Sequence, residues 1–139
     1  MAARIIIHSF DQARTALAAA AALDRDVTLA SAPGAGAYGG PGWFKALTEA
    51  AARAVPDAHY DTVLDCGAAP GIALAALRLG LKRVRFGGRS EALRRLQAIA
   101  TQLGATLEAD DEEALDLRGA RQPEARCRAW LAGGAVTRA

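Results

Sequence analysis

Residues 60–88 decide the fold and read YDTVLDCGAAPGIALAALRLGLKRVRFGG. Tyr60–Asp65 (YDTVLD) predicts a strand, and Gly71–Leu79 predicts a short helix closed by Gly80. Lys82–Phe86, in which basic and apolar residues alternate, predicts the next strand. A strand, a helix and a second strand at this spacing indicate a βαβ unit, in which the two strands run parallel.

The same alternation continues on both sides of this stretch. Further strands are expected at Arg4–His8, Asp26–Ala30 and Ala105–Glu108. Further helices are expected from the capping residue Ser9 to Leu23, at Trp43–Val55, and from the capping residue Ser90 through Glu91–Leu103. The sequence therefore predicts an α/β fold with alternating βα units and a parallel sheet of about five strands. Both a half (β/α) barrel and a flavodoxin-like three-layer sandwich are compatible with the loop lengths.

Length and composition indicate one packed domain over residues 1–139, because 52% of the 139 residues are hydrophobic and 23% are charged. Residues 110–139 are expected to form a polar C-terminal extension, with a short helix that begins at Pro123 and carries Trp130 and Leu131. No apolar run approaches the roughly 18 residues of a membrane span. The net charge of +2 is too small to indicate nucleic-acid binding. With two cysteines, Cys66 and Cys127, the chain is expected to be a cytoplasmic protein with reduced thiols.

The first candidate site is the turn Gly87, Gly88, Arg89 and Ser90, which joins a predicted strand to a predicted helix. Ligands of parallel sheets bind at the carboxyl ends of the strands. Free backbone N–H groups, the helix dipole and an arginine would together favour a phosphate or a carboxylate there. The alternative is a tight turn in which Ser90 only caps the helix.

The Gly-rich segment Ser31–Gly42 is expected to be an irregular loop whose Tyr38 could supply an aromatic wall for a ligand. The alternative is a simple long connection. The segment contains neither GxGxxG nor GKS or GKT, so no nucleotide cofactor is predicted. Two cysteines cannot form a zinc site alone, and no metal site is predicted.

Asp65 and His8 are the weak catalytic candidates, since each follows or ends a predicted strand. Asp65 could act as a general base, bind a ligand hydroxyl, or merely cap the next helix. His8 could reach the same site if the first strand neighbours the third. Arg85 either adds charge to the anion site or lies on a solvated edge, and a nucleophilic Cys66 would need a base nearby.

Most of the chain resembles the N-terminal half of aldolases of the 2-keto-3-deoxy-6-phosphogluconate type. The stretches that carry the resemblance are IIIHSFDQARTALAAAAALDRDVTL (Ile5–Leu29), RAVPDA (Arg53–Ala58) and GAAPGIALAALRLGLKRVRFGG (Gly67–Gly88). The resemblance implies the opening half of a (β/α)₈ barrel. The general-base glutamate of that family would fall near Asp26, and its substrate-binding arginine would fall near Ala30. Its Schiff-base lysine belongs to a sixth strand, which this chain is expected to lack, so class I aldolase chemistry is not implied.

Three functions follow from these observations. The first is a non-catalytic α/β protein that binds a small anionic metabolite at the strand ends. The second is a lyase-like enzyme completed by oligomerisation, with Asp65 and His8 as acid–base groups. The third is a protein-interaction module. A half barrel leaves two sheet edges uncovered, so the chain is expected either to form a homo-oligomer or to cover the edges with its C-terminal segment.

Overall fold

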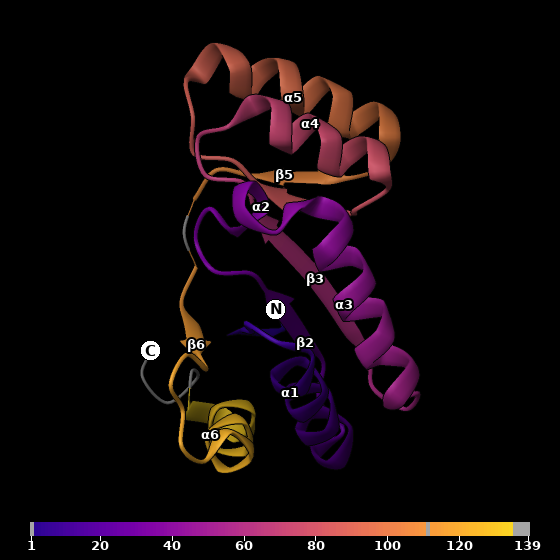
Figure 1. The fold of residues 1–139 in the computed structure, drawn as a ribbon, viewed down its shortest axis with the longest axis vertical. Helices are drawn as coiled ribbons and strands as arrows, with labels where there is room; N and C mark the ends of the chain where they lie inside the picture. Colours follow the sequence, from indigo (N-terminus) through magenta and orange to yellow (C-terminus); the bar gives the residue numbers. More distant parts are fainter. Residues whose placement is uncertain (1, 111, 135–139) are drawn as a thin grey trace. The chain divides into compact units, whose positions relative to one another are not determined.

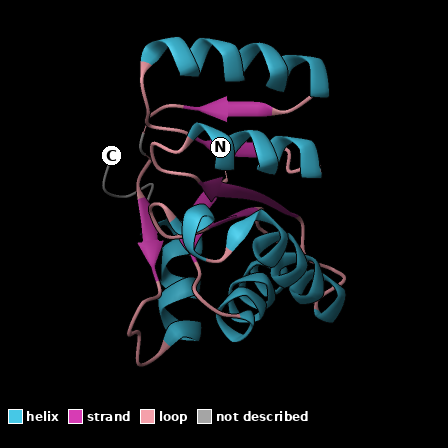
Figure 2. Cartoon of the chain, turned by 45° about the horizontal axis from the view of Figure 1, so that its top comes forward, coloured by secondary structure: helices cyan, strands magenta, loops and turns pink. Residues whose placement is uncertain are grey.

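The computed structural model describes residues 2–110 and 112–134 and confirms an α/β fold of alternating strands and helices (Figures 1 and 2). The strands are β1 (Ala3–Ile6), β2 (Val27–Ala30), β3 (Tyr60–Asp65), β4 (Arg83–Arg85), β5 (Thr106–Glu108) and β6 (Ala114–Asp116). The helices are α1 (Phe10–Leu23), α2 (Ala35–Tyr38), α3 (Gly40–Ala54), α4 (Pro70–Leu79), α5 (Ser90–Leu103), α6 (Pro123–Ala129) and the π-helical segment η1 (Trp130–Gly134). The sheet is parallel, and its strand order is β5-β4-β3-β2-β1-β6.

The chain divides into two compact units. The first comprises Met1–Ala30, Leu47–Asp61 and Glu112–Ala139, and the second comprises Ser31–Ala46 and Thr62–Asp111. Within the described residues, no helix is both long enough and apolar enough to cross a membrane.

In the first unit, β1 lies between β2 and β6 and pairs with both in parallel. Ile5 of β1 is fully buried, like Leu17 of α1, and pairs in register with Leu29 of β2. The helix α1 begins after Ser9, whose Oγ accepts a hydrogen bond from the backbone N–H of Gln12 at 3.1 Å, as its sequence predicts. The C-terminal elements α6 and η1 pack against α1, so the apolar side chains near the C-terminus cover this unit.

Strand β6 corrects the expectation that the segment after residue 110 is only a polar extension with one helix. Leu115 and Leu117 alternate with polar neighbours and are buried, which is the period of a half-exposed strand. The Leu117 N–H donates to the Ile6 carbonyl at 3.1 Å, and the Gln12 side chain donates to the Leu117 carbonyl at 3.0 Å. Before the strand, Arg4 and Glu112 form an ion pair at 2.9 Å.

The chain thus has a sixth strand, but β6 is not the sixth strand of a (β/α)₈ barrel, because no helix separates it from β5 and it pairs with β1. It reads Ala-Leu-Asp and contains no lysine. A flavodoxin-like sheet would place the first strand between the second and the third. Here β1 has β2 and β6 as its neighbours, so the winding differs from the flavodoxin order.

In the second unit, β4 lies between β3 and β5, and its register places Arg85 opposite both Asp65 and Glu108. The helices α4 and α5 pack side by side (Figure 1), with α4 also against β4 and α5 also against β5. Because both strands carry a helix after them, the loops that follow β3 and β4 each lead to a helix N-terminus.

The segment Ser31–Gly42 is not the irregular loop that its glycines predict. It contains α2, and α3 already begins at Gly40. Gly36 explains how α2 fits against the end of β3, because a Cβ atom there would lie 3.2 Å from both the Cys66 Sγ and the Asp65 carbonyl oxygen. The glycine is thus used for close packing rather than for flexibility.

Candidate functional site

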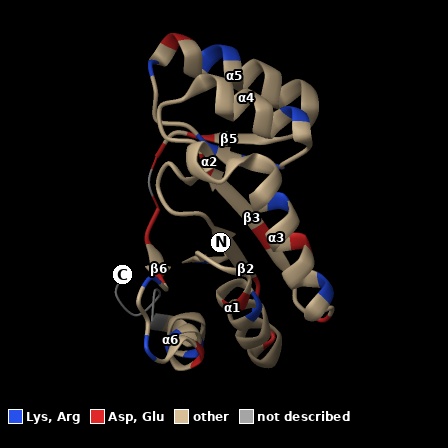
Figure 3. Ribbon diagram, in the orientation of Figure 1, with Lys and Arg blue, Asp and Glu red and all other residues tan. Residues whose placement is uncertain are grey.

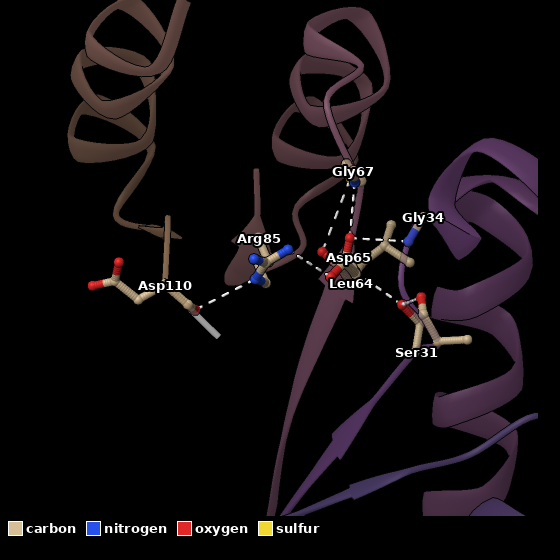
Figure 4. A network of polar contacts seen from close by, with 9 residues as sticks. Ser31, Gly34, Leu64, Asp65, Gly67, Arg85 and Asp110 are labelled. Atoms are coloured by element: carbon tan, nitrogen blue, oxygen red, sulfur yellow. Dashed lines mark hydrogen bonds and ion pairs between the residues drawn. The ribbon is translucent and has the colours of Figure 1, made fainter. Parts of the chain in front are cut away.

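The end of β3 in the second unit is organised by the carboxylate of Asp65 (Figure 4). Its Oδ1 accepts hydrogen bonds from the backbone N–H of Gly67 at 2.8 Å and of Gly34 at 3.0 Å. The Asp65 N–H in turn donates to the Ser31 Oγ at 2.9 Å. The Asp65 side chain therefore connects the turn after β3 to the segment that leads into α2. It acts neither as the cap of α4 nor as a free base. The N-cap of α4 is Ala69.

Arg85 occupies the second oxygen of this carboxylate. Its Nη1 lies 2.9 Å from the Asp65 Oδ2, and its Nε donates to the Asp110 carbonyl at 3.3 Å. The side chains of Asp65 and Arg85 are only 12% and 18% exposed, so the pair is largely shielded from water. Arg85 thus neutralises Asp65 instead of serving as a solvated edge residue.

Cys66 follows Asp65 and is buried. Burial, reinforced by the negative charge of Asp65, raises the pKa of the Cys66 thiol to about 12. A thiol of this kind remains protonated at neutral pH and is a poor nucleophile.

A cavity of about 660 Å³ lies beside this network, at the carboxyl ends of β3 and β4. Three of the residues that the sequence predicts for an anion site line it, namely Gly87, Gly88 and Arg89. The remaining lining residues are Ala68, Pro70, Phe86 and Ala92. The turn Ala68–Pro70 belongs to the loop that follows β3, another strand end at which the carboxyl-end rule predicts ligands, but its residues were not among those predicted for the anion site.

The lining of the cavity requires glycine at position 88. A Cβ atom on Gly88 would lie 2.2 Å from the Phe86 Cζ, and Phe86 itself is only 1% exposed. The Gly87 N–H donates to the Gly67 carbonyl at 2.7 Å, which joins the turns after β3 and β4. Since the Gly67 N–H also donates to Asp65, the ion pair of Asp65 and Arg85 is linked through Gly67 to the turn that lines the cavity.

Arg89 places a positive charge at the edge of this cavity. Arg89 is exposed, and within residues 2–110 and 112–134 its side chain has no ion pair or hydrogen bond. Arg89 is the N-cap of α5, which corrects the prediction that Ser90 fills that position. Neither Arg89 nor Ala69 provides a side-chain acceptor for the helix that follows it. The first N–H groups of α4 and α5 therefore carry positive partial charge beside the cavity lining.

The other predicted site residues lie elsewhere. Ser90 is the first residue of α5 and does not line the cavity, and neither do Asp65 or Tyr38. Tyr38 lies on α2 with 90% of its surface exposed.

His8 belongs to the first unit and is not brought to Asp65 by strand pairing, because β1 is not adjacent to β3. Its Nε2 lies 2.6 Å from the Asp116 Oδ1. Partial burial acts to raise the pKa of Asp116, but the hydrogen bonds from His8 and from the backbone of Arg118 outweigh it and lower the pKa. The interaction of His8 with Asp116 connects β6 to the residues that follow β1.

Among the side chains that the structure describes, no group of three His, Cys, Asp or Glu residues is arranged to hold a metal ion. Comparison with known proteins adds no assignment: no protein-family model matches the chain, and no relative was found among the curated proteins.

Proposed function

We propose that this protein binds a small molecule bearing a phosphate or a carboxylate in the cavity at the carboxyl ends of β3 and β4. The observation that carries the proposal is the guanidinium of Arg89, which is exposed on the cavity lining and has no protein partner among the described residues. An arginine of this kind is available for a planar, bidentate contact with an oxyanion.

The backbone around Arg89 supports the same ligand chemistry. Gly87 and Gly88 present no side chain between the cavity and the main chain, so an anion can approach the backbone closely. The Gly87 N–H is already bound to the Gly67 carbonyl, so the N–H of Gly88 is the donor that this turn offers to a ligand. The N-terminus of α5 adds the positive end of a helix dipole to the charge of Arg89. The ligand itself is unidentified, and phosphate and carboxylate share the chemistry that this arrangement recognises.

Binding without catalysis accounts for the neighbouring groups better than a lyase does. Both carboxylate oxygens of Asp65 are bound to protein donors, so a role as general base would require the network to open. The lysines of the chain are Lys45, in α3, and Lys82, before β4, and neither lies on a strand, where the aldolase resemblance would place the Schiff base. We therefore favour a binding protein over an aldolase-like enzyme.

The test is a thermal-shift titration with inorganic phosphate, glycerol 3-phosphate and pyruvate, on protein whose oligomeric state is known from light scattering. A ligand at a hundred times its Kd should stabilise the native state by about 2.7 kcal/mol. Arg89→Ala should abolish the shift. Arg94→Ala removes an exposed arginine of the same helix that does not line the cavity, and it should leave the shift intact.

Three results would overturn the proposal: no stabilisation by any of the compounds, an equal shift in Arg89→Ala, or loss of the shift in both arginine variants. The last result would mean that only the general charge of α5 matters. Turnover of any keto acid or sugar phosphate that is lost in Asp65→Asn, at a temperature where circular dichroism shows the variant to be folded, would favour the lyase instead.

A further inference from the structure

We infer that the bound anion carries a short apolar tail, which lies in the groove between α4 and α5. This inference rests on the proposed function, because it extends the same site. The groove has a volume of about 460 Å³ and shares Pro70, Arg89 and Ala92 with the anion cavity. The two depressions therefore meet at Arg89, and a single ligand can occupy both.

Six of the nine residues that line the groove are apolar or glycine. Leu74 of α4 and Leu96 and Ile99 of α5 are its large apolar side chains, and the small residues Gly71 and Ala92 also line it. Apolar walls leave water without hydrogen-bond partners, so the groove favours methylene groups over a second polar moiety.

Of the charged side chains that line the groove, Arg89 is the one that can pair with a ligand. Glu91 and Arg95 also line it, but they pair with each other at 3.1 Å and remain largely exposed at 70% and 78%. Their charges cancel locally, and Arg89 supplies the excess positive charge. The charged residues of α5 lie in its N-terminal half (Figure 3), so the helix is basic toward the cavity and uncharged toward its C-terminal end. This gradient matches a ligand with an anionic head and an apolar tail.

The length of the groove sets the length of the tail. Ala92, Leu96 and Ile99 lie on successive turns of one face of α5. From Ala92 to Ile99 the helix rises about 10 Å, which an extended chain of about eight carbons would span. The ligand class is thus a free short-chain alkyl or acyl anion, rather than a sugar phosphate or a lipid in a bilayer.

The experiment is calorimetric titration of the full chain with methyl, butyl, hexyl and octyl phosphate, each below its micelle-forming concentration. Complete burial of a methylene group would lower the Kd about fourfold. Because the groove is open on one side, we expect half of that free energy, so the Kd should fall about twofold for each added methylene. Ile99→Gln should flatten this chain-length dependence while leaving the Kd of methyl phosphate unchanged. Leu103→Gln, a matched change at an exposed leucine of α5 outside the groove, should preserve the dependence.

The outcomes separate this inference from the proposed function. If no phosphate binds, methyl phosphate included, the proposed function fails. If all four bind with the same Kd, the anion site stands and the apolar tail is refuted. The apolar tail is also refuted if octanol binds as tightly as octyl phosphate, because the anionic head would then contribute nothing. It is refuted too if octyl phosphate does not bind while vesicles of phosphatidic acid retain the wild-type chain and not Arg89→Ala, because the ligand would then be a lipid surface.

Discussion

Replacing Asp65 by asparagine tests whether the buried ion pair holds the strand ends together. The amide keeps the size of the carboxylate, and its oxygen can still accept from the N–H groups of Gly34 and Gly67. Its NH₂ group, however, would face the guanidinium of Arg85. Two hydrogen-bond donors would then meet where Arg85 now has a carboxylate oxygen at 2.9 Å. The change therefore removes one interaction and leaves the backbone contacts in place.

The expected loss of stability follows from the burial of the pair. Removing one partner of a fully buried ion pair destabilises a protein by about 3–5 kcal/mol. Because Asp65 and Arg85 are 12% and 18% exposed, the lower end of that range applies, about 3 kcal/mol. For a chain of this length, about 4 °C of Tm corresponds to each kcal/mol, so Tm should fall by about 12 °C.

Urea and thermal unfolding followed by circular dichroism measure this loss. Asp57→Asn, at an exposed aspartate, is the matched control and should change stability by less than about 0.5 kcal/mol. In a double-mutant cycle with Arg85→Gln, the combined variant should be more stable than the sum of the single losses predicts, by about 1–2 kcal/mol. A loss below about 1 kcal/mol in Asp65→Asn, together with additive single effects, would refute the buried pair as the support of this region.

Three further predictions concern other parts of the chain. Gly88→Ala should lower the free energy of unfolding in urea titrations by about 1–3 kcal/mol, since the new methyl group would collide with Phe86. In the control Gly71→Ala the methyl group meets no atom within 4 Å, so that variant should be as stable as wild type or slightly more stable. The Cys66 thiol, with a pKa of about 12, should react with iodoacetamide at pH 8 far more slowly in native than in urea-unfolded protein; equal rates would contradict its burial. The pKa of Asp116 is lower in the folded than in the unfolded state, so its contribution to stability is present above the unfolded pKa and is lost as pH falls through the folded one. Asp116→Asn should therefore be less stable than wild type at pH 6 and equally stable at pH 2 by thermal unfolding, and a difference that persists at pH 2 would contradict this.

The parts of the fold that the sequence predicts correctly are those determined by local chemistry. Strand β3 has the predicted bounds, Tyr60–Asp65. Gly80 and Gly104 end their helices in the left-handed conformation that glycine adopts most easily. Ser9 caps α1 through the backbone of Gln12, the first half of the capping pattern in its sequence.

The elements that the sequence does not predict are short and depend on distant partners. Strand β6 has three residues, and its formation depends on pairing with β1 far away in the chain. The direction of Arg85 could not be read from the alternation of β4, because the partner that turns it inward is Asp65, opposite it in the register with β3. For the candidate site, the turn Gly87–Arg89 was found from the strand-end rule, whereas Phe86 beneath it could be assigned only after packing was known.

The pairing of β1 with β6 has a consequence for how the chain acquires its structure during synthesis. Strands β3, β4 and β5 follow one another in the chain, so their unit can assemble while the ribosome is still making later residues. The first unit must wait for residues 112–134, and loop closure over more than half the chain makes that pairing slow. Until then the outer edge of β1 is bare and can pair with another nascent chain. Truncation before Glu112 should therefore produce aggregates rather than a smaller soluble protein, because residues 112–134 cover the edge of β1 that would otherwise pair with another chain.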